Sequence, residues 1–272
     1  CMRRMVIFIV LCCLYGLSLY AEGGYAYIRD ISYRQPSPED AYADSLCRLD
    51  VACPKGVSDA PVIVWFHGGG LTGGSKEIPE PLLTGDVVVV GVGYRMYLHV
   101  TIREILDDAA AAVSWVLDSI AGFGGSADKV YLSGHSAGGY LIDMVGLDKK
   151  LLAKYGKDAD KLAGLIPCSG QVITHFEIRR TMGMSPLQPL IDDTAPISHV
   201  RKDCPPILLI SGDREKELYG RYEETAYFWR LLKLAGHPDV TFYELDGYDH
   251  GNMLVASYPL ILQFVKEHEK KE

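Results

Sequence analysis

The strongest chemical signal in the chain is a glycine-rich run around Ser136. Residues 134–139 read Gly-His-Ser-Ala-Gly-Gly and lie between an apolar run and a stretch with helical spacing. A serine on such a tight turn from strand to helix takes a strained backbone conformation, and flanking side chains larger than glycine would clash. The pattern predicts a nucleophilic hydroxyl at Ser136, with the amide of Ala137 free to point at an oxyanion.

A second glycine-rich run lies upstream. Residues 67–70 read His-Gly-Gly-Gly and directly follow an apolar run that ends at Phe66. Consecutive glycines let backbone N–H groups approach a ligand that side chains would otherwise block. Together with the amide of Ala137, these amides could stabilise a tetrahedral oxyanion, each donor contributing about 3 kcal/mol. Either run alone could be an ordinary turn, but the two together favour acyl-transfer chemistry.

A serine hydroxyl is a poor nucleophile unless a base removes its proton. His250 is the predicted base, because it follows the last apolar run, in residues 247–251 (Gly-Tyr-Asp-His-Gly), where a loop could reach back over the serine. The other histidines lack this setting. His135 lies inside the serine turn and His67 should brace its own loop. We interpret the rest as solvated or core side chains, with His175 the main exception because it lies in a predicted cap.

The acid that orients the base should follow the apolar run 207–210, where residues 211–217 read Ser-Gly-Asp-Arg-Glu-Lys-Glu. Asp213 is closest to the end of that run and has the shorter side chain. Glu215 falls three residues after the glycine, where many such enzymes place the acid, and Glu217 lies further along. We predict that Asp213 or Glu215 is the acid and keep Glu217 as the less favoured alternative.

The elements that would position these residues alternate along the chain. Short apolar runs rich in β-branched residues, typical of strands buried on both faces, occupy 62–66, 87–92, 129–133, 162–167, 207–210 and 240–245. Helical spacing occupies 102–120, a stretch from 137, 222–234 and 258–269. This alternation predicts an α/β fold with one twisted, mostly parallel sheet covered by helices on both faces. Residues 25–59 should supply edge strands, and 169–199 a cap or pocket wall.

Composition limits the possible functions. The chain has 272 residues, of which 48% are hydrophobic, so it can bury a core large enough for an ordinary domain. Its formal net charge is -8 and no basic block interrupts the sequence, which argues against a nucleic-acid partner. No pair of Cys or His has the spacing of a structural zinc site, and no glycine-rich loop carries a phosphate-binding Lys-Ser/Thr. We therefore expect neither a metal nor a cofactor.

The first residues resemble a secretory signal peptide. Arg3 and Arg4 precede the apolar run 5–19, which is followed by Tyr20, Ala21 and a polar stretch. A membrane-spanning helix needs about 20 apolar residues, so this run is short for a stable span. We predict that residues 1–21 are a leader cleaved after Ala21, with an uncleaved anchor as the alternative, and that residues 22–272 form one secreted or periplasmic domain.

Removal of that leader would leave four cysteines: Cys47, Cys53, Cys168 and Cys204. An exported protein permits disulfides, and Cys47 and Cys53 flank a short apolar stretch. A strand between these two would hold them too far apart to bond, however. Disulfide pairing and buried free thiols are both open from the sequence.

Taken together, these motifs resemble a known group of enzymes. The residues at 67–70 and 134–139, the pair Tyr94-Arg95 after a valine-rich run, and the late Asp-His-Gly at 249–251 are similar to those of hormone-sensitive-lipase-like and feruloyl-esterase-like carboxylesterases, which are single-domain α/β-hydrolases. The resemblance implies that the amides of Gly69, Gly70 and Ala137 form the oxyanion hole. Two features depart from the family pattern: the usual signature after the acid is missing, and so are the N-terminal cap helices of the lipase-like branch.

The missing cap helices and the leader favour small, open esterases that act on acetyl or feruloyl groups of plant polysaccharides. The partner would then be a small-molecule or carbohydrate ester, hydrolysed through an acyl-serine intermediate. One alternative is a serine peptidase of the prolyl-oligopeptidase type, although those enzymes usually carry a propeller domain. The other is an inactive hydrolase-fold binding module, although such proteins typically lose the serine, the histidine or the glycines retained here.

Overall fold

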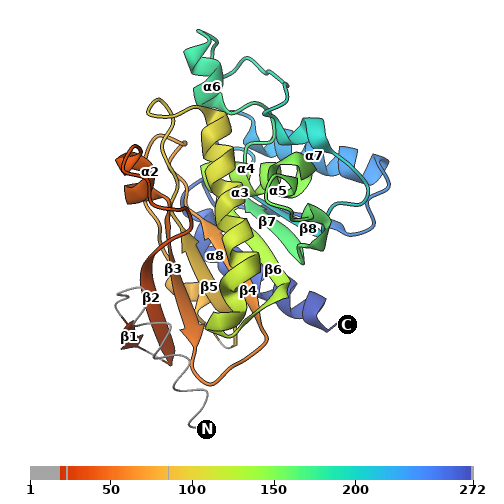
Figure 1. The fold of residues 1–272 in the computed structure, drawn as a ribbon. Helices are drawn as coiled ribbons and strands as arrows, with labels where there is room; N and C mark the ends of the chain where they lie inside the picture. Colours follow the sequence, from red (N-terminus) through yellow and green to blue (C-terminus); the bar gives the residue numbers. More distant parts are fainter. Residues whose placement is uncertain (1–18, 23, 85, 271–272) are drawn as a thin grey trace.

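The computed structural model describes residues 19–22, 24–84 and 86–270, and within them nine strands form one sheet (Figure 1). The strand order is β1-β2-β3-β5-β4-β6-β7-β8-β9. The strands are β1 (Leu19–Glu22), β2 (Tyr25–Ser32), β3 (Arg48–Pro54), β4 (Ala60–Phe66), β5 (Val88–Val92), β6 (Gly125–His135), β7 (Gly164–Cys168), β8 (Ile207–Gly212) and β9 (Val240–Leu245). The helices are α2 (Ala41–Leu46), α3 (Ile102–Ser119), α4 (Ala137–Leu147), α5 (Lys149–Ala153), α6 (Phe176–Thr181), α7 (Arg221–Leu234) and α8 (Met253–Glu269).

The mostly parallel sheet predicted from the sequence is confirmed. Strands β5, β4, β6, β7, β8 and β9 run parallel to one another, whereas β1, β2 and β3 form antiparallel pairs at one edge, including the pair of β3 with β5. The segment 25–59 thus supplies edge strands as expected. Parallel strands bring their carboxyl ends to the same side of a sheet, where ligand sites of α/β folds are found.

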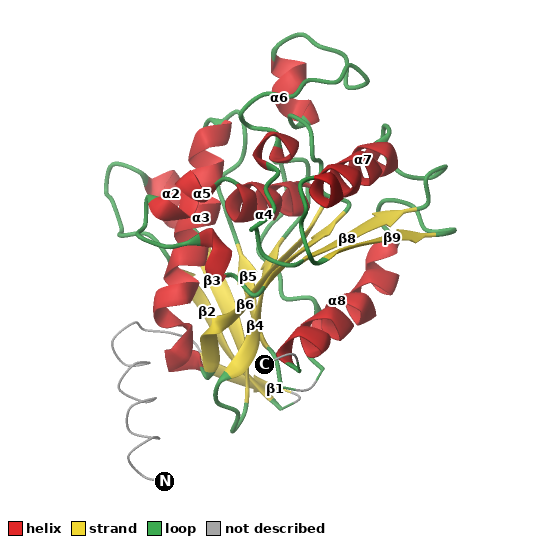
Figure 2. Cartoon of the chain, turned by 90° about the vertical axis from the view of Figure 1, so that its right-hand side faces the viewer, coloured by secondary structure: helices red, strands yellow, loops and turns green. Residues whose placement is uncertain are grey.

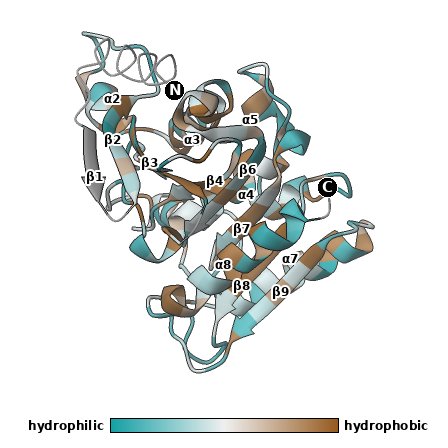
Figure 3. Ribbon diagram, turned by 90° about the horizontal axis from the view of Figure 1, so that it is seen from below, coloured by the Kyte–Doolittle hydropathy of each residue, from teal (hydrophilic) through white to brown (hydrophobic). Residues whose placement is uncertain are grey.

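The central strands are apolar throughout because both of their faces are covered. In β4, Val62, Val64 and Phe66 pack into one core cluster, whereas Ile63 and Trp65 pack into another, and all five side chains are fully buried. A strand with one wet face would alternate apolar and polar residues instead. Figure 3 shows hydrophobic residues along the central strands.

The helices divide between the two faces of the sheet (Figure 2). Apolar side chains of α3, α4 and α7 belong to the first core cluster, and those of α8 belong to the second. Helix α3 begins at the predicted residue, where Thr101 accepts a hydrogen bond from the Glu104 amide and Glu104 accepts one from the Thr101 amide. This reciprocal capping satisfies two amides that the helix itself leaves free.

Helix α8 is longer than the sequence predicted. We expected it to begin at Tyr258, but it begins at Met253 and carries Pro259 inside. Proline has no N–H to donate to the carbonyl four residues earlier, which here belongs to Val255. The Val255 side chain is 71% exposed, so this side of the helix faces solvent and water can satisfy the carbonyl.

Residues 1–18 of the predicted leader lie outside the described residues, and its cleavage stays a prediction. Strand β1 pairs with β2 through Leu19–Glu22, so cleavage after Ala21 would leave only the last residue of that strand. In the part of the chain that the structure describes, none of the helices has both the length and the apolar character needed to cross a bilayer.

Among the described residues the four remaining cysteines are buried free thiols. Cys47 directly precedes strand β3, and Cys53 lies near the end of that strand. Six residues of extended chain span about 20 Å, far more than a disulfide can bridge. Of the two states left open by the sequence, the structure contains the free thiols.

Asp143 is a fully buried carboxyl group in the core of the fold. It lies in α4, a helix whose residues are all buried, and neither carboxylate oxygen has a hydrogen-bond partner among the described residues. Burial therefore raises the pKa of Asp143 well above its ordinary value of 3.8. The unfolded chain loses this proton at lower pH than the folded chain does, so folding is increasingly disfavoured as pH rises above about 4.

We expect Asp143→Asn to raise the melting temperature by a few degrees at about pH 8 and to have little effect near pH 4, because asparagine has no proton to lose. Melting curves across this pH range test the expectation. Asp128→Asn is the control, because Asp128 is exposed. A variant that is less stable than the parent at every pH would show that the Asp143 carboxylate is ionised and stabilised in the fold.

Candidate active site

Ser136 lies on the turn that joins β6 to α4, as the sequence predicted. Its backbone angles are φ 54° and ψ -112°, a conformation that non-glycine residues rarely adopt. Its amide donates a hydrogen bond of 2.8 Å to the carbonyl of Cys168, the last residue of β7. Ser136 is only 7% exposed. The turn is thus held between two neighbouring strands, with the serine at their carboxyl ends.

The glycines of the serine turn are required by close backbone contacts. A Cβ atom at Gly138 would lie 2.0 Å from the carbonyl oxygen of Phe66, and one at Gly134 would lie 2.7 Å from the carbonyl carbon of Gly138. Both distances are far below a van der Waals contact. No side chain fits at either position, so the sequence pattern around Ser136 requires glycine at both.

The structure brings the predicted base to the serine. Nε2 of His250 lies 2.9 Å from Oγ of Ser136, close enough to accept its proton. His135 supports the loop that carries this imidazole, since its Nε2 donates a 2.8 Å hydrogen bond to the His250 carbonyl. Burial, with the charge of His250 as the second cause, lowers the pKa of His135 to about 4. His135 is therefore a neutral brace at ordinary pH.

The carboxylate beside His250 belongs to Glu217. The prediction that Asp213 or Glu215 takes this place is wrong. Oε1 of Glu217 lies 2.7 Å from Nδ1 of His250, and the Glu217 side chain is 1% exposed. A turn places it there, because the Glu217 amide donates to the Asp213 carbonyl. This turn directs the longer glutamate side chain inward to the imidazole.

The two favoured carboxylates lie elsewhere. Asp213 accepts hydrogen bonds from the amides of Gly247 (2.7 Å) and Glu215 (2.9 Å), and these bonds lower the pKa of its carboxyl. Asp213 thus ties the acid loop to the loop that leads to His250. Glu215 is exposed. The sequence offered no signal for this division of roles.

Two residues absent from the sequence hypothesis complete the surroundings of Glu217. Ser169 donates a short hydrogen bond to Glu217 Oε2, and its Oγ lies 3.0 Å from His250 Nδ1. Arg221, 2% exposed, donates to the Ser169 carbonyl. Burial raises the pKa of Glu217, but the bond and charge of His250, the Ser169 bond and the charge of Arg221 outweigh it, so the pKa is lowered overall. Glu217 is therefore an anion at neutral pH.

The His-Gly-Gly-Gly loop lies beside the serine turn. A Cβ atom at Gly68 would lie 3.6 Å from the Cβ of Ser136. Gly69 and Gly70 have φ values of 114° and 63°, and a Cβ at Gly69 would lie 2.1 Å from the Gly73 carbonyl oxygen. The amides of Gly69, Gly70 and Ala137 have no hydrogen-bond acceptor among the described residues. These donors are free to bind an anionic oxygen.

His67 braces this loop, as predicted. Its ring stacks on Tyr94 with centroids 4.3 Å apart, and the Tyr94 hydroxyl donates a 2.8 Å bond to the His67 carbonyl. Burial lowers the pKa of His67, which keeps the stacked ring neutral. The Tyr94 side chain is fully buried, so the contact fixes the loop to the core.

The predicted cap segment, residues 169–199, contains the short helix α6 and lies at the same end of the molecule (Figure 1). A Cβ atom at Gly70 would lie 3.4 Å from the ring of Phe176, so the cap touches the glycine loop. His175 is fully buried, and burial lowers its pKa well below 6.5. Among the described residues, no cluster of three or more His, Cys, Asp or Glu side chains is arranged to hold a metal ion.

Comparison with known proteins agrees with this geometry. The sequence profile of the carboxylesterase family matches residues 30–188, which is more than half of the chain and includes both glycine runs. The chain belongs to the carboxylesterase family. This carboxylesterase-family chain is 26% identical over 217 residues to esterase LipC of Mycobacterium tuberculosis, covering 71% of this chain and 53% of the relative. It is 40% identical over 138 residues to cocaine esterase of Oryctolagus cuniculus, covering 46% and 26%.

The chain therefore spans about half of the first relative and about a quarter of the second. Solved structures share the carboxylesterase fold. A truncated carbohydrate esterase from gut microbiota superposes with a TM-score of 0.73 at 19% identity, covering 93% of this chain and all of the other. Esterase B from Lactobacillus rhamnosis gives 0.73 at 17% identity, with 99% and 93% covered. At these identities the likeness establishes the fold alone.

The strain at Ser136 should be measurable as stability. Glycine adopts positive φ without the steric cost that a Cβ imposes, so we expect Ser136→Gly to be more stable than Ser136→Ala by about 1 kcal/mol or more in urea unfolding. The same pair at Ser119, whose φ is -118°, should show the opposite order. Equal stabilities of the two Ser136 variants would mean that the turn is relaxed.

Proposed function

We propose that the protein is a serine carboxylesterase in which Ser136 is the nucleophile, His250 the base and Glu217 the acid. The observation that carries the proposal is the unbroken series of contacts from Ser136 Oγ to His250 Nε2 (2.9 Å) and from His250 Nδ1 to Glu217 Oε1 (2.7 Å). The free amide of Ala137 lies at the serine turn, and those of Gly69 and Gly70 lie in the loop beside it. Nucleophile, base, acid and oxyanion donors are the parts that acyl transfer needs.

The reaction proceeds in two halves. Ser136 Oγ attacks the ester carbonyl carbon while its proton passes to Nε2 of His250, and the carbonyl oxygen becomes an oxyanion bound by the free amides. The tetrahedral intermediate collapses, the alcohol leaves with the proton from the imidazolium, and an acyl-serine remains. Water then gives a proton to His250 as it attacks the acyl carbon, the bond to Oγ breaks, the carboxylic acid leaves, and the imidazolium returns the proton to Ser136. Throughout the reaction Glu217 accepts a hydrogen bond from the Nδ1–H group of His250, which stabilises the imidazolium.

The proposed substrates are short acyl esters, namely acetyl or feruloyl groups carried by plant polysaccharides. Support comes from the cap, because the helix described within it, α6, has only six residues. One of the solved structures with this fold is named a carbohydrate esterase. We propose that the enzyme acts in the periplasm or outside the cell, on the strength of the leader-like residues 1–21, and N-terminal sequencing of exported protein tests this.

We expect purified protein to hydrolyse p-nitrophenyl acetate and butyrate at least about tenfold better, in kcat/KM, than the dodecanoate, and to release acetate from acetylated xylan or ferulate from methyl ferulate. Ser136→Ala should abolish both hydrolysis and covalent labelling by a fluorophosphonate probe. A preference for long acyl chains, labelling that survives in the variant, or cleavage of a prolyl p-nitroanilide in place of the esters would overturn the proposal.

Glu217 should be the one loop carboxylate whose loss is severe. Glu217→Gln keeps the shape of the side chain but cannot stabilise the imidazolium, so kcat should fall by up to about 10⁴-fold with little change in KM. Glu215→Gln is the matched control and should retain most activity, because Glu215 is exposed. Asp213→Asn should lie between the two, because asparagine keeps only one of the two acceptors that hold the loops. Near-normal kcat in Glu217→Gln would remove Glu217 from the mechanism.

A further inference from the structure

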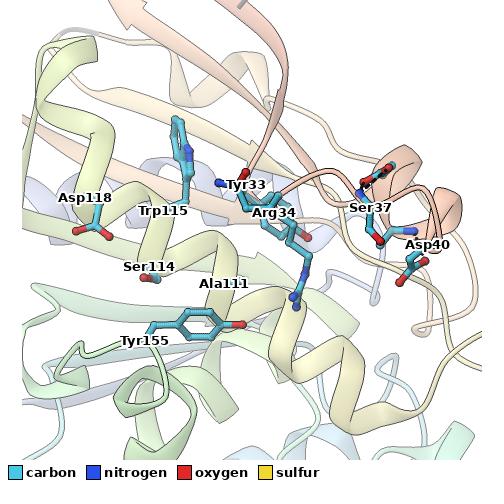
Figure 4. Close-up of a pocket in the computed structure, with 12 residues that line it drawn as sticks. Tyr33, Arg34, Ser37, Asp40, Ala111, Ser114, Trp115, Asp118 and Tyr155 are labelled. Carbon is cyan, nitrogen blue, oxygen red and sulfur yellow. Dashed lines mark hydrogen bonds between the residues drawn. The ribbon is translucent and has the colours of Figure 1, made fainter.

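A groove of about 580 Å³ lies between α3 and the segment that precedes and includes α2 (Figure 4). Its floor includes Ala111 and Ser114 of α3, and aromatic rings come from Tyr33, Trp115 and Tyr155. The volume falls within the range of small-molecule sites, about 300 to 1,000 Å³. Neither the triad nor the glycine loop contributes to this groove.

The groove is remote from the ester site along the strand direction. Helix α3 begins after the carboxyl end of β5 and ends before Gly125, the residue of β6 that pairs with Ala60 at the start of β4. Ser114 and Trp115 lie in the second half of α3, so they sit toward the amino ends of the strands. Ser136 follows the carboxyl end of β6. A molecule in the groove would therefore not occupy the place of the reacting ester.

Polar groups in the groove are left without partners. The hydroxyl of Ser114 and the indole N–H of Trp115 bond to no other described residue, and both atoms are open to the solvent in the groove. Such groups can exchange water for the hydroxyl groups of a ligand. Asp44 accepts weak 3.2 Å bonds from the Ser37 amide and forms no ion pair within the described chain. Acceptors and donors thus remain for a ligand.

Hydrogen bonds fix two of the three aromatic side chains that line the groove, Tyr33 and Tyr155. The Tyr33 hydroxyl donates to the Gly93 carbonyl at 2.7 Å, and the Tyr155 hydroxyl donates to Asp107 at 2.9 Å. Arg34 is 2.9 Å from Asp107, which joins the two walls through one carboxylate. A site whose side chains are already fixed loses little conformational entropy when a ligand binds.

We propose that this groove binds a neutral sugar chain. Flat rings from Trp115 and Tyr155 match the C–H faces of a pyranose, and the free hydroxyl, indole N–H and carboxylate match its hydroxyl rim. The other charges are mostly compensated, because Arg34 pairs with Asp107, Asp40 with Arg95 and Asp118 with Lys157. Because these charges are paired, the groove disfavours a strongly charged ligand of either sign and favours a polyol.

On a polysaccharide esterase the groove would hold one stretch of polymer while another presents its ester to Ser136, and this consequence rests on the proposed function. Sugar binding itself does not. It is measured on Ser136→Ala protein, so a failure of binding and a failure of ester hydrolysis are distinguishable.

The experiment titrates Ser136→Ala with xylohexaose, cellohexaose and mannohexaose by calorimetry. We expect at least one of them to bind, and Trp115→Ala in the same background to weaken that binding by about tenfold or more. Trp229→Ala is the matched control, because Trp229 is also half-buried but lies on α7. Ser114→Met, which fills the floor and keeps Trp115, should also abolish binding. With Ser136 present, Trp115→Ala should raise KM on acetylated xylan and leave hydrolysis of p-nitrophenyl acetate unchanged.

Absence of binding by all three sugars at millimolar concentration would overturn the proposal. So would equal binding by folded Ser114→Met protein, or a preference for spermidine over the sugars, which would make the groove a cation site. Circular dichroism establishes that each variant is folded before it is titrated.

Discussion

The whole site depends on the approach of Gly138 to the carbonyl of Phe66. Any side chain at Gly138 would bring an atom to 2.0 Å from that oxygen, so helix α4 can start against the end of β4 only with glycine there. Phe66 is the last residue before the His-Gly-Gly-Gly loop, and it pairs with Gly134 of β6. One contact without side chains therefore sets the serine turn next to the oxyanion loop.

This constraint explains why much of the fold and site could be predicted from the sequence. Close backbone contacts leave glycines at fixed positions, and strands buried on both faces leave continuous apolar runs such as 62–66. Both signals are local in the sequence, so Ser136 and the central strands are readable directly. His250 was readable because few histidines follow the last strand. Helix α2 and the early start of α8 were not, because α2 has only six residues and Pro259 normally marks the start or the end of a helix.

The identity of the acid could not be predicted for a related reason. The loop after β8 holds Asp213, Glu215 and Glu217 within five residues, and their spacing from the strand does not say which of them faces the imidazole. The turn that closes on the Asp213 carbonyl decides it, together with backbone amides that occupy both Asp213 oxygens. The contact with Gly247 joins residues 34 positions apart, which a single sequence does not reveal.

The structure places strain symmetrically about the imidazole of His250. Ser136 and Ser169 each follow the end of a parallel strand, β6 and β7, and each has a positive φ, 54° and 51°. Their hydroxyls lie against opposite ring nitrogens, 2.9 Å from Nε2 and 3.0 Å from Nδ1. Such a conformation costs about 1 to 3 kcal/mol at each serine and persists only where surrounding contacts enforce it. Here the amides of both serines are held by carbonyls of the next strand, Cys168 and Ile210. The parallel sheet thus supports two strained turns whose serine hydroxyls contact the same imidazole. The orientation of His250 therefore follows from the order of the strands.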